Sequence, residues 1–138
     1  MKPIILDTNI LLDIFVFEDA RARKLRNALL KQRIKPYSNQ ATVEEFADVI
    51  SRPLFSLEDK KQVDIVGQWQ SLSQALDDLN LETAPWKCQD SDDQVFLDIA
   101  FTLRPSILIS KDNEILKLAS RAIKEDVLIT ADYNAFTL

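Results

Sequence analysis

Short apolar runs recur along the chain and predict the strands of a sheet. Residues 3–6, "PIIL", form the first run, and "SILIS" at 106–110 and "DVLIT" at 126–130 have the same apolar, β-branched character. Runs of this length between polar segments are typical of buried strands. The segment "RIKPYSN" at 33–39 predicts a further short strand that ends in a turn at Ser38 and Asn39.

Between these runs, apolar residues recur at the spacing of an amphipathic helix. The predicted helices follow Thr8 and Asn9 and then cover residues 18–32, 40–51, 57–80, 91–103 and 113–124. The segment 57–80 is predicted as one long or one broken helix. Gly67 is its weak point, because glycine in a helix costs about 1 kcal/mol relative to alanine. Strands that alternate with helices predict a three-layer α/β/α sandwich around a parallel sheet of four to five strands.

The composition narrows the class of protein. A chain of 138 residues suits one domain, which we expect to span residues 1–138. A single glycine excludes glycine-rich phosphate loops, and the absence of histidine excludes histidine triads and histidine-ligated zinc. The lone Cys88 cannot form an internal disulfide, and Met1 leads into a strand without a signal peptide or a membrane-spanning stretch. We therefore expect a cytoplasmic protein with no membrane segment.

Basic residues are unevenly distributed along the chain. The formal net charge of −5 is not that of a simple nucleic-acid-binding domain. Nevertheless seven of the 17 basic residues lie in one stretch without an acid, namely Arg21, Arg23, Lys24, Arg26, Lys31, Arg33 and Lys35. The default interpretation is a solvated helix face, and the alternative is an edge that contacts phosphates.

Two acids directly follow predicted strands. Asp7 comes after the strand at 3–6, and Asp112 follows the strand at 106–110. In a parallel α/β sheet, ligands bind beyond the carboxyl ends of the strands, so these two carboxylates face one crevice if the strands are neighbours. The alternative is that each acid only caps the helix that follows it.

Other acids lie on the predicted helices. Asp93 stands three, four and seven residues before Phe96, Leu97 and Ala100, which makes it the first position of an inward-facing stripe. A carboxylate there is costly without a partner. The alternative is a first-turn position behind a cap at Asp90 or Ser91, and Asp92 is a neighbouring candidate.

Glu44 and Glu45 lie early in the predicted helix at 40–51. The apolar stripe of that helix does not choose between them, and a solvated helix face is the default for both.

Taken together, the acids indicate a metal site. Hard divalent cations such as Mg²⁺ prefer carboxylate and water oxygens, and a bound cation relieves the repulsion among clustered carboxylates. Such a site activates water and stabilises the transition state of phosphodiester cleavage. It requires no histidine, which agrees with this composition.

Four stretches resemble the PIN domain (PilT N-terminus) ribonucleases, in the order of that family: "ILDTNILLD", "VEEFADVISRP", "DSDDQVFLDIA" and "ILISKDNEIL". The resemblance covers almost the whole chain and implies the PIN fold. The final "VLITADYNAF" resembles the closing strand and tail of a branch described as toxins of toxin–antitoxin pairs.

The resemblance also implies roles for single residues. The catalytic and metal-binding acids of the family correspond to Asp7, Glu45, Asp93 and Asp112, and polar residues near the first acid to Asn9 and Ser110. One position departs from the family, which often has glycine where this chain has Lys111. A lysine there either contacts a phosphate or offsets part of the negative charge of the site.

The expected activity is a Mg²⁺- or Mn²⁺-dependent endoribonuclease that acts on single-stranded RNA as the toxin of a pair. The expected partners are the RNA substrate, an antitoxin protein and a second copy of the chain. The expected RNA contacts are Arg21, Lys24, Arg26, Lys31 and Lys111. One alternative is an inactive PIN module for RNA binding or assembly. Another is a phosphatase of the haloacid-dehalogenase type, which would need a second acid where this chain has Asn9.

Overall fold

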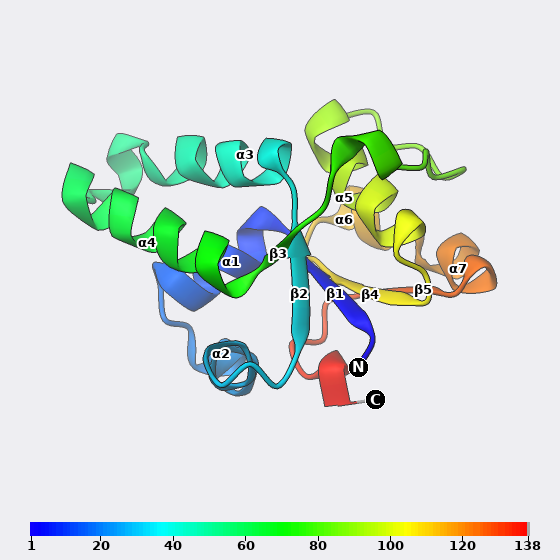
Figure 1. The fold of residues 1–138 in the computed structure, drawn as a ribbon, viewed down its shortest axis with the longest axis horizontal. Coiled ribbons are helices and arrows are strands. Elements are labelled where there is room, and N and C mark those ends of the chain that lie inside the picture. Colours follow the sequence, from blue (N-terminus) through cyan, green and yellow to red (C-terminus); the bar gives the residue numbers. More distant parts are fainter. Residues whose placement is uncertain (138) are drawn as a thin grey trace.

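The computed structural model describes residues 1–137 and shows a central parallel sheet of five strands (Figure 1). The strand order is β3-β2-β1-β4-β5, and every neighbouring pair is parallel. The strands are β1 (Pro3–Leu6), β2 (Lys35–Ser38), β3 (Gln74–Ala75), β4 (Ser106–Ile109) and β5 (Val127–Thr130). The sequence prediction of a parallel sheet with four to five strands is therefore confirmed.

Helices cover both faces of this sheet. Figure 1 shows α1, α2, α3 and α4 on one side and α5, α6 and α7 on the other. The helices are α1 (Thr8–Phe15), α2 (Arg23–Leu30), α3 (Gln40–Ile50), α4 (Asp59–Leu72), α5 (Ser91–Thr102), α6 (Asn113–Leu116) and α7 (Ala119–Ala122). The result is the predicted three-layer α/β/α sandwich.

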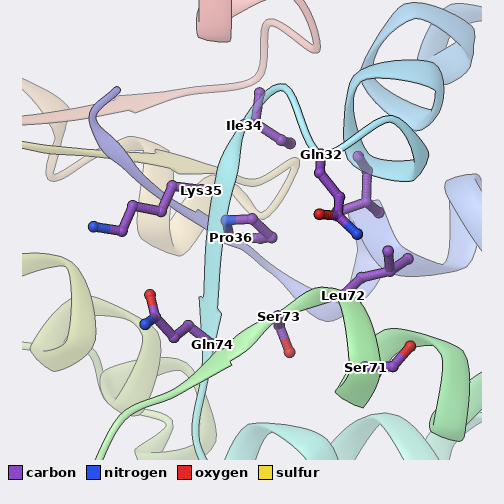
Figure 2. A pocket seen from close by; sticks show the side chains of 9 residues that line it. Gln32, Ile34, Lys35, Pro36, Ser71, Leu72, Ser73 and Gln74 are labelled. Carbon is purple, nitrogen blue, oxygen red and sulfur yellow. The ribbon is translucent and has the colours of Figure 1, made fainter.

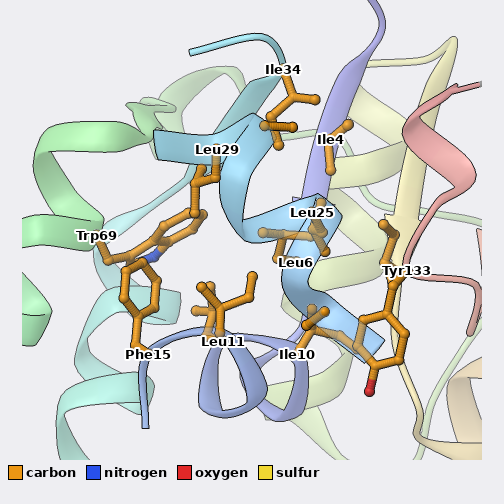
Figure 3. Close-up of a cluster of buried hydrophobic side chains, with 14 of the residues drawn as sticks. Ile4, Leu6, Ile10, Leu11, Phe15, Leu25, Leu29, Ile34, Trp69 and Tyr133 are labelled. Carbon is orange, nitrogen blue, oxygen red and sulfur yellow. The ribbon is translucent and has the colours of Figure 1, made fainter. Parts of the chain in front are cut away.

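Two hydrophobic clusters hold the layers together. Side chains of β1 alternate between them, since successive residues of a strand point to opposite faces. Ile4 and Leu6 pack with the first cluster, on the side of α1 to α4, whereas Ile5 packs with the second, on the side of α5 to α7. Figure 3 shows part of the first cluster, in which Trp69 of α4 packs beside Phe15 of α1.

The segment 57–80 forms neither one long helix nor one broken helix, the two structures predicted for it. Helix α4 ends at Leu72, and residues 74–75 form the edge strand β3. The apolar spacing continues past residue 72, but the backbone turns extended at Ser73 and pairs with β2 through the amide of Leu76, which donates to the carbonyl of Ser38 at 2.8 Å. Hydrogen bonding between distant segments therefore overrides local periodicity here.

Other helix boundaries also differ from the prediction. The segment 18–32 begins with a 3₁₀ turn at Ala20–Ala22, and α2 starts at Arg23. The segment 113–124 divides into α6 and α7, followed by a 3₁₀ turn at Ile123–Glu125. Among residues 1–137, no helix has the length and apolar character needed to cross a membrane.

Gly67 lies inside α4 rather than at a break, and it is exposed. A Cβ atom added there meets no other atom within 4 Å. We therefore expect Gly67→Ala to raise the free energy of unfolding by about 0.5–1 kcal/mol, because alanine restricts the unfolded chain and favours the helix. Urea unfolding would show a higher midpoint with an unchanged slope. A lower midpoint would contradict the packing of α4 described here. Gln68→Ala, at an exposed neighbour in the same helix, is the control.

Candidate functional site

Asp7 lies at the carboxyl end of β1 and caps α1. Its amide donates to the carbonyl of Ile109 at 3.0 Å, which ties it to the end of β4. Its Oδ1 accepts from the amide of Thr8 at 2.7 Å, and its Oδ2 accepts from Ser110 Oγ at 2.6 Å and Asn9 Nδ2 at 3.2 Å. Asp7 thus caps α1 and also lies where the carboxyl ends of β1 and β4 meet. The two interpretations of the sequence are therefore compatible.

The Asp7 carboxylate is buried without a basic partner. Only 4% of the residue is exposed, and no Lys or Arg of residues 1–137 forms an ion pair with it. Burial raises the pKa of Asp7, against the hydrogen bond from Ser110, which lowers it. The free energy of desolvating this charge is therefore only partly offset by neutral donors, which is a common property of functional carboxylates.

Asp112 lies in the turn between β4 and α6, next to the fully buried Ser110. The amide of Asp112 donates to Ser110 Oγ at 3.0 Å, so one hydroxyl group connects Asp112 to Asp7. The Oδ1 of Asp112 accepts from the amide of Glu114 at 2.8 Å and caps α6. Both predicted strand-end acids therefore lie at the same edge of the sheet, because β1 and β4 are neighbours.

Asp93 faces Asp112 from the first turn of α5. Burial, followed by the charge of Asp112 and the hydrogen bond between the two side chains, raises the pKa of Asp93 to about 7. The charge of Asp7 adds to the same effect. Near neutral pH Asp93 is therefore protonated in part of the molecules, as expected for an acid placed close to another acid.

Glu45, rather than Glu44, points to this edge of the sheet. Its Oε2 accepts from Thr8 Oγ1 at 2.6 Å, and burial raises the pKa of Glu45 against that hydrogen bond. Glu44 is exposed and accepts from Gln40 Nε2 at 3.0 Å. Periodicity could not separate the two glutamates, because the deciding contact comes from α1.

Asp92 precedes Asp93 in the first turn of α5. Together with Glu45, it lines a hollow of about 20 Å³ that also includes Ala41, Thr42 and Val95. The charges of Asp7, Asp92 and Asp90 contribute to the raised pKa of Glu45. Both aspartates of the pair thus face other acids, Asp93 toward Asp112 and Asp92 toward Glu45.

A sequence model of a known family matches this chain over residues 3–114, and its description is "PIN domain". The chain belongs to the PIN domain family. The match spans most of the chain, from β1 to the start of α6, and includes all four predicted acids. PIN domains are generally nucleases, which are hydrolases, and typically use divalent metal ions. No curated protein matches the chain.

The acids of this PIN domain do not form a complete metal-coordination site in residues 1–137. In the part of the chain that the structure describes, no group of three or more His, Cys, Asp or Glu side chains is arranged to hold an ion. Instead, Asp93 pairs with Asp112, while Asp7 and Glu45 are linked through the backbone and hydroxyl of Thr8. The donor set nevertheless fits a hard divalent cation, since it consists of oxygen atoms alone and has an excess of negative charge.

Three of the predicted RNA contacts form ion pairs with acids. The Nζ of Lys111 binds Asp13 Oδ2 at 2.6 Å, and Arg21 binds Asp19 at 2.7 Å. Arg26 lies 3.7 Å from Glu18, whereas Lys24 is exposed.

Lys31 lies at the opposite end of the sheet from the acids. It follows the last residue of α2, shortly before β2 begins, whereas the acids lie where the strands end. Lys31 therefore lies away from the acids, because α2 runs toward the amino ends of the strands, and its contact with RNA stays a prediction.

A cavity of about 330 Å³ lies away from the acids (Figure 2). It lies between the end of α2, the start of β2 and the end of α4. Its lining contains no acid: Leu29, Gln32, Ile34, Lys35, Pro36, Ser71, Leu72, Ser73 and Gln74. The size of the cavity does not make it the functional site, since the groups with perturbed pKa values lie elsewhere.

Proposed function

We propose that this PIN domain is a Mg²⁺- or Mn²⁺-dependent endoribonuclease that cleaves single-stranded RNA. The observation that carries the proposal is the arrangement of Asp7, Asp93 and Asp112, whose carboxyl groups interact at the carboxyl ends of β1 and β4 without a basic partner in the described residues. Carboxylates in this arrangement repel one another, and a divalent cation removes that repulsion.

In this proposal Asp7, Glu45, Asp93 and Asp112 hold the metal. The bound ion supplies Lewis acidity toward the phosphodiester and activates water. The remaining steps belong to the protein. Ser110 and Asn9 orient the Asp7 carboxylate, and Thr8 orients Glu45. Asp93, which is protonated in part of the molecules near neutral pH, would hold the cation in its ionised form.

Metal removal tests this function. We expect excess EDTA to abolish internal cleavage of a labelled, unstructured RNA by the purified protein, and added Mn²⁺ to restore it. The reason is that four carboxylates repel the negatively charged phosphate, so the substrate can bind among them only when a metal cation is present. The cleavage products are resolved by denaturing electrophoresis, with single-stranded DNA and duplex RNA as comparison substrates. Cleavage of the RNA that persists in EDTA would contradict the proposal.

A second candidate function is an inactive PIN module that binds RNA or assembles with other proteins. The absence of a ready three-acid group in residues 1–137 favours this alternative. It predicts RNA binding without turnover in Mn²⁺, so the same electrophoresis combined with a filter-binding measurement distinguishes it from the endoribonuclease.

The biological role that we propose is that of a toxin in the cytoplasm, with an antitoxin protein as partner and a homodimer as its own assembly. The resemblance of "VLITADYNAF" to the tail of the toxin branch supports this role. An adjacent gene for a small antitoxin and a dimer in sedimentation analysis are the observations that test it.

A further inference from the structure

A cluster of three side chains lies beside the candidate site, and neither the family match nor the sequence patterns account for it. Asp13 of α1 is 4% exposed. Its Oδ2 accepts from Lys111 Nζ at 2.6 Å and from the hydroxyl of Tyr133 at 2.5 Å. Figure 3 shows the Tyr133 ring beside Ile10, one turn before Asp13 on α1. We call Asp13, Lys111 and Tyr133 the positioning cluster.

The positioning cluster joins three segments that are distant in the sequence. Asp13 lies on α1, Lys111 in the turn between β4 and α6, and Tyr133 in the segment after β5. A buried carboxylate is costly to leave unpaired, so Asp13 strongly favours the arrangement in which both donors reach it. The Lys111 side chain is therefore bound to Asp13 and is not available to bind a phosphate.

Lys111 is held in place by contacts of both its side chain and its backbone. Its side chain binds Asp13, and its amide donates to Asn9 Oδ1 at 3.2 Å. The residue before it, Ser110, donates to Asp7. The turn that carries Asp112 is thus attached to the end of β1 and to α1 through Asp7, Asn9 and Asp13.

The attachment of this turn to β1 and α1 opposes the electrostatic repulsion among the acids of the site. Asp112 lies near Asp93 and Asp7, and like charges at these positions raise the free energy of any arrangement that keeps the acids close. Within residues 1–137, the ion pair between Lys111 and Asp13 is the only attachment of this turn in which both groups are charged, and the hydroxyl of Tyr133 binds the same Asp13 carboxylate. Groups behind metal ligands typically change metal affinity about 10–100-fold when they are removed.

We propose that the positioning cluster holds the turn between β4 and α6 against α1 and so sets the position of Ser110 and Asp112 for the cation. The part that concerns metal binding rests on the proposed function. Tyr133 lies beyond the residues 3–114 that match the family, so the segment after β5 contributes to the site through Asp13. Asp13, Lys111 and Tyr133 are positioning residues in this scheme and do not touch the substrate.

Tyr133→Phe is the sharpest test, because it removes one hydroxyl group and keeps the buried ring. We expect hydrogen exchange at the amides of Lys111 and Asp112 to become about tenfold faster in EDTA, while exchange in β1 stays unchanged. We also expect Mn²⁺ to bind about tenfold more weakly in titration calorimetry. Lys111→Met is expected to show the same two changes, and Lys111→Arg to restore most of the parental behaviour because it keeps the cation.

Asp48→Asn is the matched control, since it removes an ion pair with Arg52 on the exposed face of α3. It should alter neither the exchange nor the binding of Mn²⁺. Unchanged exchange at residues 111 and 112 in folded Tyr133→Phe overturns the inference, whether or not Mn²⁺ binds. Faster exchange with unchanged Mn²⁺ affinity also overturns it, because Asp112 is then not positioned for the cation. A parent protein that binds no Mn²⁺ contradicts the proposed function instead, and the exchange measurement still decides whether the cluster holds the turn.

Discussion

Asp7→Asn is expected to reduce metal-dependent RNA cleavage by about a thousandfold or more. Lewis-acid stabilisation by a bound cation is worth several kcal/mol, and each 1.4 kcal/mol corresponds to a tenfold change in rate. Asparagine keeps the size of the side chain and is as good a helix cap as aspartate, so the cap of α1 persists. The measurement is the single-turnover rate on labelled RNA at saturating Mn²⁺.

The same substitution should not destabilise the protein. The Asp7 carboxylate is buried and its pKa is raised by desolvation, so a neutral side chain removes an unfavourable term from the folded state. We therefore expect an unfolding midpoint in EDTA close to that of the parent, because the asparagine relieves the buried charge but its amide nitrogen cannot accept the hydrogen bonds that Oδ2 accepts from Ser110 and Asn9. Asp48→Asn, at an exposed position on α3, makes the same chemical change away from the site and should keep the parental rate. If Asp7→Asn cleaves RNA at the rate of the parent, Asp7 is not a catalytic residue.

Asp93→Asn is expected to weaken Mn²⁺ binding about 10–100-fold and to remove a pH dependence from the metal-free protein. The pKa of Asp93 is about 7 in the folded protein and near its ordinary value of 3.8 in the unfolded chain. Between these values the folded state binds more protons than the unfolded state. The stability of the metal-free protein therefore falls as the pH rises from about 4 to 7.

Urea unfolding in EDTA at pH 5 and pH 8 tests this dependence. The parent should be more stable at pH 5, and added Mn²⁺ should stabilise it more at pH 8, where no proton competes with the cation for Asp93. In Asp93→Asn the difference between the two pH values should shrink, since asparagine preserves the hydrogen bond to Asp112 without titrating. Asp64→Asn on α4, where the side chain is exposed, is the control. A parent that is more stable at pH 8 in EDTA would contradict the raised pKa of Asp93.

Much of the fold could be predicted because it depends on local pattern. The apolar runs at 3–6, 106–110 and 126–130 form strands in the structure, and helices α3 and α5 lie close to the bounds predicted for them, 40–51 and 91–103. The segment 57–80 could not be predicted in the same way. Its apolar spacing is uniform, and only the neighbouring strand β2 makes residues 74–75 extended.

The candidate site was predictable in part for a related reason. Asp7 and Asp112 follow strands, and the ends of parallel strands meet at one edge of a sheet. Asp13 was also visible as an isolated acid in an apolar run, between Leu12 and Ile14, but no pattern named its partners. Its two donors, Lys111 and Tyr133, are 98 and 120 residues away along the chain.

The sequence by itself determined the parallel α/β architecture, the acids at the strand ends and the membership of the PIN family, because each depends on the order and spacing of neighbouring residues. The tertiary structure alone decided that Thr8 binds Glu45, that Lys111 binds Asp13, and that Lys31 lies away from the acids. The physical reason is that a charged side chain takes the position in which its desolvation is best compensated. That position depends on groups that only folding brings together.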